Sequence, residues 1–184
     1  LGLSANTSAD LAFCRKPCIV QRSEDIRLIF EIKMGIVDNY VFDEASGCFT
    51  YAGNMESHKG RPSLSRSDSM LKAIGKAINI RTSCENGRRI PIIVVGNTPV
   101  PESYRRKVDN LRTSGIVNRF MCVHADENSF PPARATDKKG FVPYRDYAGV
   151  ESYISSVLET EQYFFSAMTD MSTLGNIIEE AGRE

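Results

Sequence analysis

Several features that would assign a chain to a specialised class are scarce in this 184-residue sequence, which has no tryptophan and only two histidines. Its longest apolar runs, such as Ile92–Val95, are far shorter than the ~20 residues that a membrane-spanning helix needs. The first residues lack the basic and apolar segments of a signal peptide. His58 and His124 are too far apart in sequence to form a local metal motif. Hydrophobic residues make up 41% and charged residues 25%, which indicates an ordinary globular domain rather than a disordered chain.

Cysteines are present but do not form a recognisable framework. The five cysteines are an odd number, and their spacings do not fit a set of disulfides. Cys14 and Cys18 are not followed by a second Cys/His pair, so a zinc site is not expected. We expect reduced thiols in a cytoplasmic, prokaryotic protein.

Motifs of several large enzyme classes are also absent. The sequence contains no G-x-x-x-x-G-K-[ST], which excludes a P-loop nucleotide site. It contains no G-x-S-x-G or His-Glu-x-x-His, which excludes the commonest serine-hydrolase and zinc-protease signatures.

The formal net charge is zero, but the charges are unevenly placed. Residues 59–89 contain eight basic and two acidic side chains, whereas residues 146–184 contain eight acidic and one basic. This distribution fits two solvated surfaces. It also fits a middle region that faces phosphates and an acidic tail that stays away from them.

The hydrophobic pattern predicts an α/β fold with a mixed central β-sheet flanked by helices. An α/β core over residues 1–124 is expected, followed by a loop and a helical extension over 125–184 that packs on it. The expected elements are strands at 7–19, 26–37, 90–95 and 117–123, and a hairpin or long excursion at 38–62 that turns around residues 45–47. A helix that Ser65 or Ser67 can cap, a turn at 86–87, a helix from Ser103 to Arg112, a loop at 125–148 and a long helix at 150–181 are also expected.

Three residues stand out as candidates for chemistry: Asp10, Glu31 and Lys33. Glu31 and Lys33 are two residues apart on a predicted strand, so their side chains share one face. They interrupt an apolar segment, where charged groups are costly unless they are paired or functional. A hairpin would bring Asp10 beside Glu31, and two carboxylates provide oxygen ligands for Mg²⁺. The alternative is that Glu31 and Lys33 form a surface salt bridge.

The segments Ser8–Phe13 and Leu28–Lys33 resemble the two halves of the PD-(D/E)XK motif of restriction-endonuclease-like nucleases, with Ala9 in the place of the usual proline. The resemblance covers residues 7–123. It implies that Asp10 and Glu31 bind Mg²⁺, that the carbonyl of Ile32 adds a ligand, and that Lys33 positions or activates a water. The implied activity is Mg²⁺-dependent endonuclease cleavage of DNA, leaving a 5′-phosphate, by a type II restriction enzyme or its catalytic domain.

Such folds usually have a helix and a strand before the strand that carries the aspartate, and only nine residues precede Asp10. We therefore expect this strand to lie at a sheet edge or to be completed by another chain, such as an upstream fragment or a second subunit. A homodimer would suit the cutting of both strands of a palindrome.

Double-stranded DNA is the expected partner. Arginine, lysine and serine side chains contact phosphates in such interfaces, and the candidates here are Lys59, Arg61, Arg66, Ser67, Lys72 and Lys76. Two other functions remain open. One is a non-cleaving DNA-binding or assembly module with a nuclease-like fold, and the other is a small-molecule-binding domain in which Glu31 and Lys33 are an ion pair.

Overall fold

A five-stranded mixed sheet forms the centre of the protein in the computed structural model, which describes residues 1, 9–35, 38–54, 63–123, 133–160 and 171–183. The strand order is β1-β2-β5-β6-β7, with β1 antiparallel to β2 and the other neighbours parallel. The strands are β1 Leu11–Cys14, β2 Ile26–Lys33, β5 Ile92–Gly96, β6 Arg119–Val123 and β7 Phe141–Tyr144. The expected mixed sheet is confirmed, and β1 lies at an edge of the described sheet.

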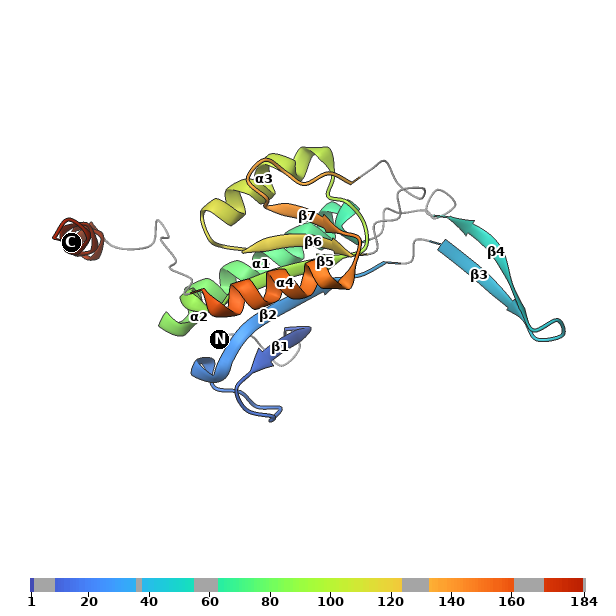
Figure 1. Ribbon diagram of the computed structural model, residues 1–184, viewed down its shortest axis with the longest axis horizontal. Coiled ribbons are helices and arrows are strands. Elements are labelled where there is room, and N and C mark those ends of the chain that lie inside the picture. The colour runs from blue at the N-terminus through green and yellow to red at the C-terminus, as the bar shows by residue number, and fades with distance from the viewer. Residues whose placement is uncertain (2–8, 36–37, 55–62, 124–132, 161–170, 184) are drawn as a thin grey trace.

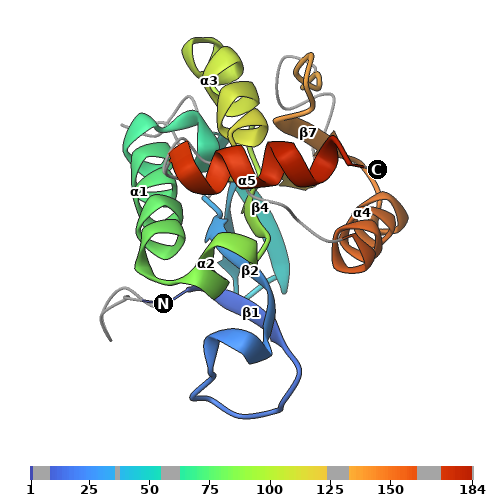
Figure 2. The ribbon, with the colours of Figure 1, turned by 90° about the vertical axis from the view of Figure 1, so that its left-hand side faces the viewer.

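Helices cover both faces of this sheet (Figures 1 and 2). On one face, α1 (Ser67–Ser83) and α3 (Glu102–Thr113) pack on a core that includes Ile29, Val94 and Phe120. On the other face, α4 (Tyr147–Glu159) packs on a smaller core that includes Leu28 and Met121. Alternate residues of β2 therefore enter different cores, which explains why this strand reads as a nearly continuous apolar segment. Among the described residues, no helix is long and apolar enough to cross a membrane.

Strands β3 (Asp38–Asp43) and β4 (Cys48–Asn54) form a separate two-stranded hairpin, which we call the arm. The arm follows β2 in the chain and stands away from the sheet (Figure 1). The turn expected around residues 45–47 is present, with Gly47 at a φ of +66°. Asp43 accepts hydrogen bonds from the Ala45 N–H and the Ser46 hydroxyl, so local polar contacts define the turn.

Four details differ from the sequence-based expectation. The N-cap of α1 is Arg66 rather than Ser65 or Ser67. Residues 86–87 lie within a short helix, α2 (Glu85–Arg89), rather than in a turn. Two single-turn 3₁₀ helices, η2 (Ser23–Asp25) and η4 (Ser63–Ser65), precede β2 and α1. Strand β1 is shorter than residues 7–19, because the chain turns after Cys14.

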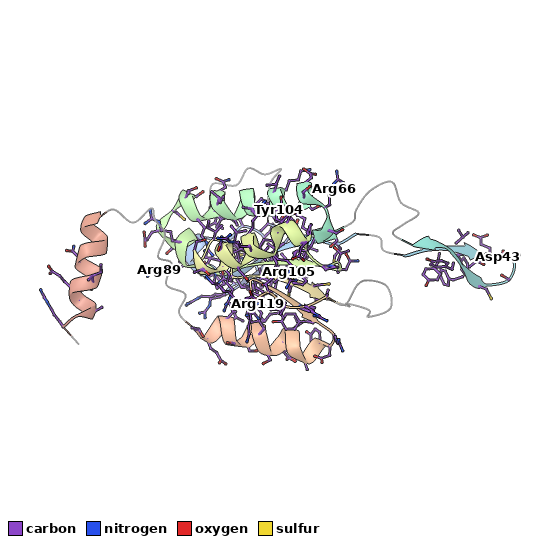
Figure 3. All side chains as sticks on the ribbon, turned by 90° about the horizontal axis from the view of Figure 1, so that it is seen from above. Asp43, Arg66, Arg89, Tyr104, Arg105 and Arg119 are labelled. Atoms are coloured by element: carbon purple, nitrogen blue, oxygen red, sulfur yellow. The ribbon has the colours of Figure 1, made fainter. Side chains whose placement is uncertain are left out.

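The C-terminal third also differs. Residues 141–144 form β7 instead of part of a loop, so the boundary expected at residue 124 falls inside the sheet. The helix expected over 150–181 is not continuous, because Thr160 has extended backbone angles and ends α4. Residues 161–170 lie outside the described residues, and α5 (Met171–Ala181) stands apart from the sheet in Figures 1 and 3.

Asp109 on α3 explains how the segment before β7 is held. Its Oδ1 accepts hydrogen bonds from the Thr136 hydroxyl at 2.5 Å and the Gly140 N–H at 2.8 Å, and its Oδ2 accepts one from the Lys138 N–H at 3.2 Å. Burial raises the pKa of Asp109, but these donors outweigh it and leave the pKa below its ordinary value of 3.8.

We expect Asp109→Ala to lower the free energy of unfolding by roughly 1.5–3 kcal/mol, the range for hydrogen bonds to a charged group. Urea denaturation at neutral pH measures this, with the exposed Asp137→Ala as the matched control. Because the pKa of Asp109 is lowered by folding, its contribution is present above pH 3.8 and is lost as the pH falls through the folded-state value. The difference between wild type and Asp109→Ala should therefore shrink in acid. An equal loss in both variants would contradict the anchoring role.

Candidate functional site

Strand pairing brings the two predicted carboxylates together at the carboxyl end of β2. Leu11 pairs with Phe30 in the antiparallel β1–β2 ladder, so Asp10 lies beside the last residues of β2. The Asp10 Oδ2 accepts a hydrogen bond of 2.7 Å from the backbone N–H of Ile32. Glu31 is the residue before Ile32 on the same strand, and its side chain lies on the face that α1 covers.

Two ammonium groups contact both carboxylates. The Lys33 Nζ donates to Glu31 Oε1 and lies 3.6 Å from Asp10 Oδ2. The Lys76 Nζ, which comes from α1, lies 2.9 Å from Glu31 Oε2 and 3.9 Å from Asp10 Oδ1. We refer to Asp10, Glu31, Lys33 and Lys76 as the four-charge site.

The carboxylate of Glu31 is the most buried member, with only 4% of its side chain exposed. Taking an unpaired carboxylate out of water costs several kcal/mol, and this cost is offset only when opposite charges and hydrogen bonds surround the group. Lys33 and Lys76 supply both. The site is therefore charge-balanced as it stands.

Asp10 lies at the more exposed side of the site. Burial raises the pKa of Asp10, but the backbone N–H of Ile32 and the ammonium groups of Lys33 and Lys76 outweigh that effect and leave its pKa below the ordinary value. Asp10 is thus a carboxylate at neutral pH and can act as a metal ligand.

Polar contacts tie the ends of β2 and β5 together beside the site. The Asn97 side chain donates to the Gly35 carbonyl at 2.6 Å and accepts from the Gly35 N–H at 3.0 Å. The Ser63 hydroxyl donates to the Lys33 carbonyl and accepts from the Asn97 N–H. Gly96 lets this happen, because a Cβ there would lie 2.5 Å from Leu64 Cγ. We call these contacts the strand-end clamp.

The remaining predicted site residues fall into two groups. Lys59 and Arg61 lie outside the described residues. Arg66, Ser67 and Lys72 are exposed at the start of α1 (Arg66 is labelled in Figure 3), where Arg66 and Lys72 each form an ion pair with Asp68. The Ile32 carbonyl lies 3.3 Å from the Lys33 Nζ, so it borders the site.

Lys76 was expected to contact DNA but lies against the carboxylates. The signal was present in the sequence, because Ala73, Ala77 and Ile80 are buried and Lys76 lies among them at helical spacing. The sequence-based prediction of the apolar face, Met70, Leu71, Ile74, Ala77 and Ile78, placed Lys76 on another face. Leu71 and Ile78 are in fact exposed.

The site fits Mg²⁺ better than a metal that needs a closed cage. No group of three or more histidine, cysteine, aspartate or glutamate side chains in the described part of the chain could hold a metal. Mg²⁺ commonly uses one or two carboxylates and completes its shell with waters and substrate phosphates. Asp10, Glu31 and the Ile32 carbonyl provide that kind of incomplete shell.

Comparisons with protein-family models, curated proteins and solved structures give no match.

We expect Lys76→Met to raise the affinity for Mg²⁺ by roughly tenfold or more, because it removes a positive charge that competes for both carboxylates. Isothermal titration calorimetry, with Mn²⁺ electron paramagnetic resonance as a second readout, measures the change. Lys72→Met is the matched control, since Lys72 is one turn away on the same helix and pairs with Asp68. Unchanged affinity in Lys76→Met would show that the ammonium group does not compete with the metal.

Proposed function

We propose that this chain is a Mg²⁺-dependent endonuclease that hydrolyses phosphodiester bonds of double-stranded DNA, of the type II restriction kind or the catalytic domain of such an enzyme. The observation that carries the proposal is the sharing of Lys33 by Asp10 and Glu31 at the carboxyl end of one strand. Two carboxylates and a lysine in one place are the groups that the resemblance to PD-(D/E)XK nucleases calls for.

Each group has a distinct role in this proposal. Asp10 and Glu31 would hold Mg²⁺, with the Ile32 carbonyl beside them. When bound, the ion supplies Lewis-acid activation of the scissile phosphate and of a coordinated water. Lys33 would orient that water by hydrogen bonding and stabilise negative charge that develops on the phosphate.

Lys76 adds a second cation beside the reacting groups. Its ammonium balances the charge of Glu31. With Mg²⁺ held by the two carboxylates, the long and flexible lysine side chain would be able to turn toward a phosphate oxygen. Arg66 and Lys72 are exposed at the start of α1 and would contact the DNA backbone outside the site.

Glu31→Gln should lower Mg²⁺-dependent cleavage of plasmid or duplex DNA by roughly 1,000-fold or more, since a metal ion supplies several kcal/mol of transition-state stabilisation and each ~1.4 kcal/mol is a factor of ten. DNA binding should persist, because it depends mainly on basic residues. The exposed Glu102→Gln serves as the control. Cleavage by Glu31→Gln at the wild-type rate would end the nuclease proposal.

Lys76→Met separates metal binding from catalysis. We expect it to bind Mg²⁺ more tightly and yet to cleave more slowly, because a transition-state charge loses its partner. Single-turnover rates at saturating Mg²⁺ test this, with Lys107→Met, an exposed lysine on α3 that has no role in the proposal, as the control. A Lys76→Met variant that cleaves as fast as wild type would confine Lys76 to charge balance in the metal-free protein.

One observation favours a second candidate function, a non-cleaving DNA-binding or assembly module. The two carboxylates are already balanced by two ammonium groups, which is what a purely structural ion-pair network requires. This alternative predicts no Mg²⁺ binding to the wild-type protein or to Lys76→Met, so the calorimetric titration distinguishes the two functions.

A further inference from the structure

The arm has one aromatic face. In its register Tyr40 pairs with Tyr51 and Phe42 with Phe49, and directly paired residues share a face of the hairpin. The ring centroids are 5.5 Å apart in the Tyr40–Tyr51 pair and 5.0 Å apart in the Phe42–Phe49 pair, so the two rings of each pair are in contact. The pairs Val41–Thr50 and Asp43–Cys48 occupy the opposite face.

This aromatic face is exposed. Tyr40, Phe42, Phe49 and Tyr51 are between 51% and 71% exposed, and none of the four belongs to the two cores. An isolated two-stranded hairpin is at best marginally stable in water. Contiguous exposed apolar surface of this kind marks a site of interaction.

The charge of the arm argues against nucleic acid as the ligand of this face. Residues 38–54 contain three acidic side chains, Asp38, Asp43 and Glu44, and no basic one. A segment that lies on DNA needs positive charge to neutralise phosphates. The aromatic residues themselves carry no charge, which suits an apolar protein surface.

We propose that the aromatic face of the arm pairs with the same face of a second copy of this chain, forming a two-fold dimer. A two-fold interface brings the same patch of each subunit together, so the patch must be compatible with itself. The aromatic face meets that condition, because its four ring side chains are uncharged, Asp43 lies on the opposite face and Glu44 lies in the turn. This inference does not depend on the proposed nuclease activity.

Charge complementarity favours an antiparallel arrangement of the two arms. The tip of the arm carries Asp43 and Glu44, whereas Arg66 and Lys72 lie at the start of α1. Figure 3 shows Asp43 at the far end of the arm and Arg66 on the side of the core from which the arm projects. Arg66 and Lys72 share the single carboxylate of Asp68, so this part of the core keeps a net positive charge. Antiparallel pairing therefore directs each acidic tip toward these two cations of its partner, whereas parallel pairing would bring the two acidic tips together.

The size of the face sets the strength of association. An aromatic side chain buries roughly 150–250 Å² when fully covered, so the exposed halves of four rings amount to about 300–500 Å² on each arm. Two arms would bury about 600–1,000 Å² in total, which is below the ~1,200 Å² of standard stable interfaces. We therefore expect a reversible, concentration-dependent dimer.

Sedimentation velocity over a protein concentration series tests the proposal with full-length protein. Wild type should pass from monomer to dimer as concentration rises. Phe42→Ser/Phe49→Ser should raise the dimer dissociation constant at least tenfold, while Val41→Ser/Thr50→Ser, on the opposite face, should leave it unchanged. Thermal unfolding should be the same in all three, because the arm contributes no residue to the described cores.

A charge exchange tests the arrangement of the arms. Asp43→Lys/Glu44→Lys should weaken the dimer, and adding Arg66→Glu/Lys72→Glu to that variant should restore part of the loss. A wild type that stays monomeric up to about 100 μM, or a dimer that survives Phe42→Ser/Phe49→Ser, would overturn the proposal. So would a Phe42→Ser/Phe49→Ser variant that keeps the dimer but loses affinity for a DNA duplex, because the face would then bind nucleic acid.

Discussion

The balance of charge around Glu31 constrains the rest of the core. This carboxylate lies in the row of β2 that faces α1, next to the apolar side chains of Ile29 and Val94. A carboxylate in that position destabilises the fold unless cations reach it. Lys33 reaches it from the same strand, and Lys76 reaches it only when α1 has a particular rotation and height above the sheet. The small side chains of Ala73 and Ala77 allow that close approach, so helix packing and charge balance favour the same arrangement.

The same balance shapes what the site can do. Because two cations already neutralise two anions, a divalent ion must displace at least one ammonium group to bind closely. The site is consequently stable rather than repulsive. In the proposed function, a bound metal would add positive charge beside the site, so the metal and a phosphate-bearing substrate would each favour binding of the other.

Local patterns were sufficient to predict most of the fold and to single out Asp10, Glu31 and Lys33, three of the four members of the four-charge site. Apolar periodicity and turn residues predict strands β2, β5 and β6, helices α1 and α3 and the arm. The two-residue repeat of a strand predicts that the side chains of Glu31 and Lys33 lie on the same face of the sheet. Strand β7 was missed because it has four residues, includes Pro143, and is held by Asp109, a partner 31 residues from Gly140. Lys76 was misplaced because Leu71 and Ile78 were counted in the buried face. The break after α4 was also missed, since no glycine or proline marks Thr160.

The arm is inserted between the two elements that build the site, β2 and α1, yet the strand-end clamp separates it from the site mechanically. Asn97 holds Gly35 through both backbone groups, and Ser63 bridges Lys33 to Asn97 on the returning side. The clamp fixes the positions of the last residues of β2 whatever the arm does beyond them. The hairpin can therefore vary in length, aromatic content or partner without altering the spacing of Asp10, Glu31 and Lys33. Because the clamp holds the end of β2, changes in the arm are not transmitted to the carboxylates of Asp10 and Glu31. The proposed association surface and the four-charge site can therefore lie on one short segment of chain.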